Sequence, residues 1–211
     1  RTVTRKTCLS AKPVARLALF LITLLRQVPA TDMSRVFMTF EALLSVLTTD
    51  PPLRLIALAG PPGSGKTSLA KKLAEAMGPG VQALPMDGFH LDNATLETKG
   101  LLHRKGAPET FDAQGFLDAV TALSEGKLET WPGFDREADR VVPDAIVLDP
   151  TATTFLIEGN YLLLNQPVWR DLRRFWDQAI WLDVDETVLR RRLDQRWLDH
   201  GLSSEAAKVQ A

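Results

Sequence analysis

The segment GPPGSGKT, residues 60–67, constrains this chain more than any other stretch. It fits the pattern G-x-x-x-x-G-K-[ST] without a mismatch. An apolar run at residues 55–59 precedes it, and a segment with helical spacing of apolar residues follows it at 68–77. A strand, a glycine-rich loop and a helix in this order form a phosphate-binding loop, or P-loop. The segment therefore predicts a nucleoside triphosphate site rather than a glycine-rich turn that fits the pattern by chance.

Each residue type in this loop suits a bound phosphate. Gly60, Gly63 and Gly65 tolerate positive φ, which lets the loop wrap tightly so that its N–H groups face an anion. Lys66 should reach the β- and γ-phosphates, and the Thr67 hydroxyl should bind Mg²⁺. The predicted cofactors are ATP and Mg²⁺. The predicted nucleotide-binding residues are Gly60, Gly63, Ser64, Gly65, Lys66, Thr67 and Ser68.

Length and charge limit the class of protein. With 211 residues, the chain is long enough for one α/β domain with a sizeable core. Its formal net charge of −1 favours neither nucleic acid nor an anionic membrane as a partner. The single cysteine, Cys8, excludes a disulfide framework and a cysteine-rich zinc site. A reducing compartment such as the cytoplasm is therefore expected. Neither nucleic acid nor a membrane is predicted as a partner, and a homodimer is the one assembly considered.

Residues 1–32 differ in character from the rest of the chain. Several basic residues precede an apolar run at 17–25, in the pattern of a signal peptide, and the run is too short for an ordinary membrane-spanning helix. The alternatives are an export signal, a surface helix, or upstream sequence before a start at Met33 or Met38. We favour the last, because an ATP-dependent enzyme works in the cytoplasm. The predicted division is an N-terminal extension at 1–32 and a catalytic domain at 33–211.

Apolar periodicity predicts an α/β fold. Helical spacing occurs at 39–49, 113–124 and 186–200, and buried strands are predicted at 55–59, 81–86, 153–157 and 179–184. Residues 91–112 read as a polar loop, and 127–150 as short strands and turns. The alternation predicts a mostly parallel sheet with helices on both faces, a three-layer sandwich. Ligands bind beyond the carboxyl ends of such strands, so Gly60, Asp87 and Glu158 should converge.

Four residues outside the loop suit phosphoryl transfer. Asp87 can orient an acceptor hydroxyl and take its proton, or it can be a loop cap. Glu158 can hold Mg²⁺ directly or through water, or it can be an exposed acid at a strand end. Arg192 and Arg196 share a helical face and can close over the phosphates, or they can form a solvated charged face. The predicted catalytic residues are Lys66, Asp87, Arg192 and Arg196, and the predicted metal ligands are Thr67 and Glu158.

The acceptor side of the site is predicted from polar and aromatic residues. Arg104 and Lys105 can grip a polar or anionic acceptor, with His90 nearby. Phe134 can line an acceptor pocket or belong to the core. Together with Asp87, the predicted substrate-binding residues are His90, Arg104, Lys105, Phe134 and Tyr161.

Four segments in order resemble one group of P-loop kinases. They are GPPGSGKT at 60–67, MDGFHLDN at 86–93, RKGAPETFD at 104–112 and EGNYLL at 158–163. They are similar to uridine kinases, pantothenate kinases and phosphoribulokinases, and in particular to bacterial fructose transport system kinases. The resemblance runs from about residue 40 to the end of the chain. It implies a P-loop sandwich with an arginine-bearing helical lid and transfer of the ATP γ-phosphate to an alcohol, which could be a sugar, a nucleoside or a pantothenate-like compound.

The resemblance also assigns residues by position, with two departures. Asp87 matches the catalytic carboxylate and Glu158 the acid near Mg²⁺. Arg104 and Lys105 match a substrate-side loop, and Arg192 and Arg196 match the arginine-bearing lid. Phe134 stands where uridine kinases carry tyrosine. The family continues past the lid, which implies that the 33–211 domain lacks its C-terminal end.

Two other function classes stay open at this stage. A regulatory switch NTPase is suggested by the D-x-x-G pattern at 112–115, but this pattern precedes a predicted helix and the chain has no N-K-x-D. A non-catalytic nucleotide-binding protein is the second alternative.

Overall fold

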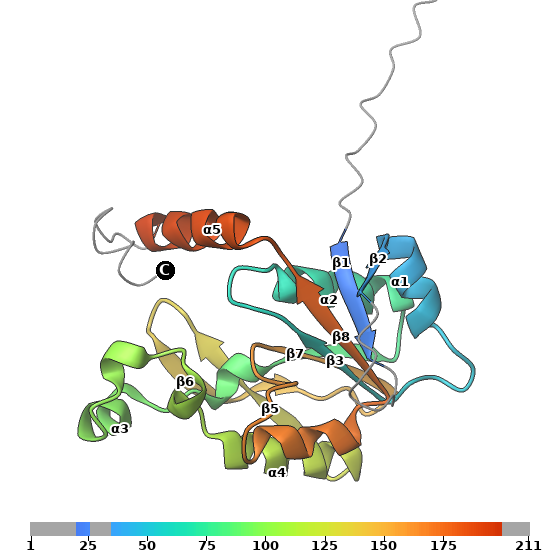
Figure 1. Cartoon of the computed structure of the whole chain (residues 1–211). Helices are drawn as coiled ribbons and strands as arrows, with labels where there is room; N and C mark the ends of the chain where they lie inside the picture. Colours follow the sequence, from blue (N-terminus) through green and yellow to red (C-terminus); the bar gives the residue numbers. More distant parts are fainter. Residues whose placement is uncertain (1–19, 26–34, 200–211) are drawn as a thin grey trace, which may run out of the picture.

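A six-stranded sheet forms the centre of the computed structural model, which describes residues 20–25 and 35–199 (Figure 1). The strand order is β2-β1-β8-β3-β7-β4. The strands are β1 (Phe20–Leu25), β2 (Arg35–Met38), β3 (Leu55–Ala59), β4 (Val81–Pro85), β7 (Thr154–Gly159) and β8 (Gln178–Asp183). Strands β8, β3, β7 and β4 run parallel to their neighbours in this series, whereas β1 is antiparallel to both β8 and β2.

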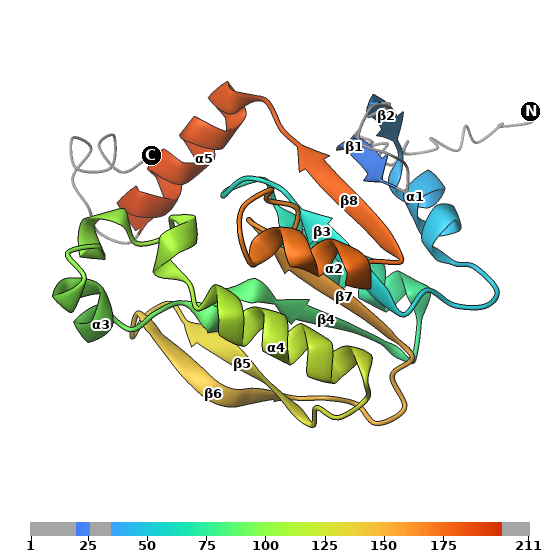
Figure 2. The same ribbon diagram turned by 60° about the horizontal axis from the view of Figure 1, so that its bottom comes forward.

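The sheet has a hydrophobic core on each face, and the side chains of the central strand β3 contribute to both cores. All five of its residues are buried, and successive side chains point to opposite faces. Ile56 and Leu58 pack in the core that includes α1 (Phe40–Leu47) and α2 (Lys66–Met77). The other face packs against α4 (Ala113–Ser124), which lies opposite α1 in Figures 1 and 2. A mostly parallel sheet with helices on both faces confirms the predicted three-layer α/β sandwich.

A separate hairpin covers the end of β4. It consists of β5 (Thr130–Asp135) and β6 (Arg140–Val147). The Trp131 ring is fully buried, and its Nε1 donates to the carbonyl oxygen of Pro85 at 2.8 Å. A Cβ atom at Gly88 would lie 2.2 Å from the Pro132 carbonyl oxygen. The backbone of the hairpin therefore approaches Gly88 so closely that only glycine fits at this position. The hairpin therefore fixes the 3-10 turn Met86–Phe89, which carries Asp87.

The final helix, α5 (Glu186–Asp199), matches its predicted range within one residue and extends beyond the sheet (Figure 1). It begins just past the carboxyl end of β8, so it starts at the same sheet edge as the P-loop. In the described part of the chain, no helix has the length and apolar character needed to cross a membrane.

The segment 91–112 was predicted as a loop, and this was wrong in part. It contains α3 (Asn93–Thr98) and the short 3-10 turns Leu102–Arg104 and Pro108–Thr110. Asp92 caps α3, because its side chain accepts a hydrogen bond from the Thr95 backbone N–H at 2.8 Å. The helix is short and polar, so apolar periodicity could not reveal it.

The described part of the N-terminal apolar run is the strand β1, and not the surface helix that was one of the three alternatives. This strand pairs with β8 from Leu21↔Asp183 to Leu25↔Ala179. The sheet therefore crosses the predicted boundary after residue 32. Residues 1–19 and 26–32 of the predicted extension lie outside the described residues.

Replacing Trp131 with phenylalanine tests how the hairpin is held. Trp131→Phe keeps an aromatic ring but leaves the partly buried Pro85 carbonyl without this donor, which should lower the free energy of unfolding by about 1–3 kcal/mol. Urea denaturation at equilibrium measures the change. Val147→Ala is the control, because Val147 lies on the same hairpin and is 73% exposed, and it should change stability by less than about 0.5 kcal/mol. Equal losses in the two variants would contradict this account.

Candidate active site

The P-loop connects β3 to α2, and its glycines are required for two different reasons. Gly63 (φ +76°) and Gly65 (φ +94°) occupy the left-handed region, which glycine tolerates. Gly60 does not have a positive φ. A Cβ atom at Gly60 would lie 2.8 Å from the backbone oxygen of Leu182 in β8. Close packing against the neighbouring strand, and not backbone conformation, therefore requires glycine at position 60.

Two buried polar groups of the loop are placed for phosphate. The Lys66 side chain is buried, and its Nζ donates to the carbonyl oxygen of Pro61 at 2.9 Å and to Asn160 Oδ1 at 2.7 Å. The Ser64 hydroxyl is buried and has no hydrogen-bond partner among the described residues. A buried hydroxyl without a hydrogen-bond partner destabilises the folded state unless a ligand supplies an acceptor, and a phosphate oxygen would do so. Asn160 was not predicted, although it lies within the EGNYLL segment.

Thr67 and Glu158 meet where Mg²⁺ was predicted. Thr67 Oγ1 donates to Glu158 Oε1 at 2.8 Å. Burial raises the pKa of the Glu158 carboxyl above its ordinary value, while the hydrogen bond from Thr67 and the charge of Lys66 act in the opposite direction. Hydroxyl and carboxylate oxygens suit Mg²⁺, so both residues fit the predicted role. The described residues hold no cluster of three or more His, Cys, Asp or Glu side chains that could bind a metal, so the remaining ligands would come from the nucleotide and water.

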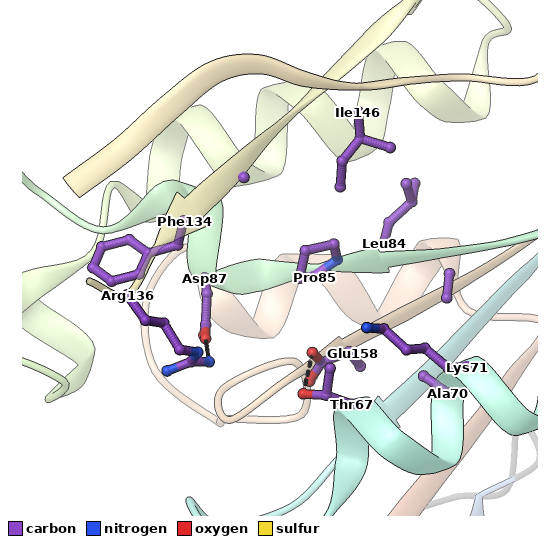
Figure 3. A pocket seen from close by; sticks show the side chains of 12 residues that line it. Thr67, Ala70, Lys71, Leu84, Pro85, Asp87, Phe134, Arg136, Ile146 and Glu158 are labelled. Atoms are coloured by element: carbon purple, nitrogen blue, oxygen red, sulfur yellow. Dashed lines mark hydrogen bonds and ion pairs between the residues drawn. The ribbon is translucent and has the colours of Figure 1, made fainter. Parts of the chain in front are cut away.

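Asp87 forms an ion pair that was not predicted. Arg136 Nη2 lies 2.5 Å from Asp87 Oδ2, and Arg136 follows strand β5 at the tip of the hairpin (Figure 3). The two residues are 49 positions apart, so no local pattern in the sequence indicates the contact.

A pocket of about 320 Å³ brings three predicted groups together (Figure 3). The metal-site pair Thr67 and Glu158, the carboxylate Asp87 and the aromatic Phe134 all line it. The full lining is Thr67, Ala70, Lys71, Ala83, Leu84, Pro85, Asp87, Gly133, Phe134, Arg136, Ile146 and Glu158. A volume near the lower end of the range for small-molecule sites suits a compact ligand.

Lys105 does not line this pocket. Its Nζ contacts Asn93 Oδ1 at 2.6 Å, Asp139 Oδ1 at 2.7 Å and the Asp139 carbonyl oxygen at 3.3 Å. Asn93 Nδ2 also donates to Asp139 Oδ2 at 2.9 Å. We call Asn93, Lys105 and Asp139 the hairpin clasp, because they join the start of α3 to the turn of the hairpin. The three donors of the ammonium group match its three contacts within the clasp.

Arg104 and Tyr161 also lie outside the pocket lining. Arg104 Nε pairs with Glu109 Oε1 at 2.6 Å, and both side chains are exposed. Tyr161 Oη donates to the Gly106 carbonyl oxygen at 2.5 Å, and its ring packs against Phe111 and Trp169. In this structure, both residues form contacts within or against residues 104–109, next to the pair Arg104 and Lys105 that was predicted to bind the acceptor.

His90 supports the aromatic wall beside the pocket. Its ring stacks on Phe111 with centroids 3.9 Å apart and lies 4.9 Å from the Phe134 ring. Its Nδ1 is buried and has no hydrogen-bond partner within the described part of the chain. Burial lowers the pKa of His90 to about 4. The negative charges of Asp87 and Asp139 act to raise this pKa, and the positive charges of Lys105 and Arg136 act to lower it further. His90 is therefore neutral near pH 7.

The arginine-bearing helix contacts the P-loop directly. Arg192 Nη1 donates to the carbonyl oxygens of Gly63 at 3.0 Å and Ser64 at 3.3 Å. A Cβ atom at Gly63 would lie 3.4 Å from Leu193, which shows how closely α5 rests on the loop. Arg196 lies on the same helix, and its side chain is outside the described part. Ser68 lies exposed in the first turn of α2.

Comparison with known proteins gives a consistent set of similarities. A model of the ATPase family associated with various cellular activities (AAA) matches residues 56–114. The "Uncharacterized protein YggC" of Escherichia coli is 38% identical over 174 residues, which cover 79% of this chain and 72% of that protein. The "Putative uridine kinase C227.14" of Schizosaccharomyces pombe is 36% identical over 189 residues, covering 83% and 79%. Several bacterial pantothenate kinases also match, and the chain spans about half of their length.

A solved structure supports the same relationship. The "putative fructose transport system kinase from Silicibacter sp. TM1040" is 48% identical and superposes with a TM-score of 0.75. The alignment covers 82% of this chain and 88% of that one.

Replacing Lys66 tests the nucleotide site. Lys66→Ala removes the positive charge expected at the β- and γ-phosphates, which should weaken ATP binding in the presence of Mg²⁺ by roughly 10- to 100-fold. Titration calorimetry measures the affinity. Lys72→Ala, on the exposed side of the same helix, should leave it unchanged. Unchanged ATP affinity in Lys66→Ala would show that the loop does not bind nucleotide through this residue.

The buried His90 predicts how stability depends on pH. Its pKa is about 4 in the folded chain and about 6.5 when unfolded, so between these values the unfolded state binds more protons. The free energy of unfolding should therefore fall as the pH falls from 6.5 to 4, by up to roughly 3 kcal/mol from this residue. His90→Phe keeps the stacking and removes the titration. Urea denaturation of both proteins between pH 4 and 7 should show a smaller loss in the variant, and parallel curves would contradict the assignment.

Proposed function

This chain belongs to the group of P-loop kinases that includes uridine kinases and pantothenate kinases, and we propose that it transfers the γ-phosphate of ATP to a hydroxyl group of a small metabolite. The observation that carries this proposal is that Asp87 lines the same pocket as Thr67 and Glu158. A group that can take a proton from an alcohol thus lies beside the groups expected at the γ-phosphate. The cytoplasm is the compartment we propose, because the reaction consumes ATP.

The donor side uses groups that converge on the P-loop. The Ser64 hydroxyl and the Lys66 ammonium bind phosphate oxygens, and Arg192 adds positive charge next to the loop. Thr67 and Glu158 would hold Mg²⁺, which neutralises charge on the phosphates when bound. By resting on Gly63, α5 restricts the access of water to the loop, and this favours transfer to an alcohol over hydrolysis.

The acceptor side depends on the pairing of Asp87. Arg136 holds Oδ2 and thereby orients the carboxylate, while Oδ1 has no hydrogen bond to another described residue. The acceptor hydroxyl gives its proton to Asp87 as its oxygen bonds to the γ-phosphorus. The bond from that phosphorus to the bridging oxygen of the β-phosphate breaks, and ADP leaves.

The D-x-x-G pattern does not support a switch NTPase. Asp112 is the N-cap of α4, and its Oδ1 accepts a hydrogen bond from the Gly115 backbone N–H at 2.9 Å. A Cβ atom at position 115 would lie 2.3 Å from the Asp112 carboxylate, which explains the glycine. The pattern is therefore a helix cap.

Asp87→Asn separates catalysis from nucleotide binding. The substitution keeps the size of the side chain but removes the base, so acceptor phosphorylation should fall by roughly 10²–10⁴-fold while ATP affinity stays within a few-fold. The measurement is ADP release over a library of metabolite alcohols, followed by steady-state kinetics with each acceptor found.

Arg136→Gln is the matched variant for this experiment, because it breaks the ion pair and keeps the carboxylate. It should lose less activity than Asp87→Asn. If Asp87→Asn phosphorylated an acceptor at the wild-type rate, Asp87 would be a loop cap and the proposed role would fail.

A further inference from the structure

Lys71 is the one cationic residue of the pocket lining that the transfer step leaves without a role. It lies on α2 and lines the pocket together with Thr67 and Ala70 from the same helix. We propose that the acceptor carries an anionic group, a carboxylate or a phosphate, and that Lys71 binds it. This inference rests on the proposed function, because the anionic group belongs to the molecule that receives the phosphate.

The other charged residues of the lining each have a partner within it. Asp87 is bonded to Arg136, and Glu158 accepts a hydrogen bond from Thr67. The Lys71 ammonium forms no hydrogen bond or ion pair with another residue in the described ranges 20–25 and 35–199. It is thus the positive charge of the pocket that stays available to a ligand.

The position of Lys71 separates it from the reacting groups. It follows Thr67 by four residues, so the two side chains share a face of α2 about one turn, or roughly 6 Å, apart. Figure 3 shows its side chain reaching from α2 toward the pocket, with Asp87 and Arg136 on the other side of Glu158. An acceptor whose hydroxyl lies at Asp87 can therefore extend past Glu158 toward the ammonium group.

The walls between these two ends are mostly apolar. They are formed by Ala70, Ala83, Leu84, Pro85 and Ile146. Once an acceptor covers them, the ammonium loses water and finds no oxygen on these side chains. An anionic group on the acceptor would replace the lost water, and the apolar surroundings would strengthen the attraction. A neutral acceptor would leave the charge unpaired.

The test compares three pairs of alcohols that differ in one anionic group. They are D-glycerate and glycerol, ribose 5-phosphate and ribose, and pantothenate and pantothenol. Steady-state kinetics with ATP and Mg²⁺ are measured for the wild type, Lys71→Ala and Lys72→Ala. Lys72 is the matched control, because it is also an exposed lysine of α2 and does not line the pocket.

We expect the wild type to prefer the anionic member of at least one pair. Lys71→Ala should raise KM for that member by roughly 10- to 100-fold, and KM for its neutral partner and for ATP should change less than about 2-fold. Lys72→Ala should change none of these values. Which pair responds separates a carboxylate from a phosphate as the group bound.

Three outcomes would overturn the inference. They are a preference for the neutral members, equal effects of the two lysine variants, and a Lys71→Ala effect confined to ATP. Turnover of a neutral alcohol in preference to its anionic partner leaves the proposed kinase function standing and removes the inference alone.

Calorimetric binding of the same six compounds is measured with a non-hydrolysable ATP analogue and Mg²⁺ present. It distinguishes failure of the anion-site inference from failure of the proposed kinase function. Binding of an anionic member that is lost in Lys71→Ala, without turnover of any compound, supports the anion site and counts against the proposed transfer. No binding of any anionic member overturns the inference.

Discussion

The register of three parallel strands decides where chemistry can occur in this chain. Glu158 of β7 pairs with Leu58 of β3 on one side and with Pro85 of β4 on the other. The P-loop begins two residues after Leu58, and Asp87 comes two residues after Pro85. Backbone hydrogen bonds therefore set the spacing among the phosphate loop, the metal-site acid and the carboxylate. A shift of one residue in either pairing would turn these side chains to the opposite face of the sheet.

The β5–β6 hairpin provides the side chains that enclose Asp87 from outside the sheet. A carboxylate at a strand end projects into solvent unless something approaches from outside the sheet, and the hairpin provides Phe134 and Arg136 at that place. The fully buried Trp131 ring holds the hairpin against the turn that carries Asp87. Fold stability and the geometry of the candidate site therefore depend on the same contact.

Local patterns predicted the parts of the site that are local in the chain. The strand, the P-loop and α2 follow one another directly, and α4 occupies the predicted range 113–124. The convergence of Asp87 and Glu158 followed from the rule for parallel sheets. What could not be predicted depends on contacts between distant residues: the pairing of Arg136 with Asp87, the packing of Gly60 against β8, and the engagement of Lys105 within the clasp. The pairing of β1 with β8 is another contact between distant residues that the sequence did not reveal.

The hairpin clasp limits how the segments beside the candidate site could be altered. Asn93, Lys105 and Asp139 complete one another's hydrogen bonds, so a change at one position leaves polar groups of the other two unpaired. Each single substitution carries a penalty that a compatible triple substitution avoids. Directed evolution by single steps would therefore find this region resistant to change, while Phe134 and Ile146 on the pocket wall could vary independently.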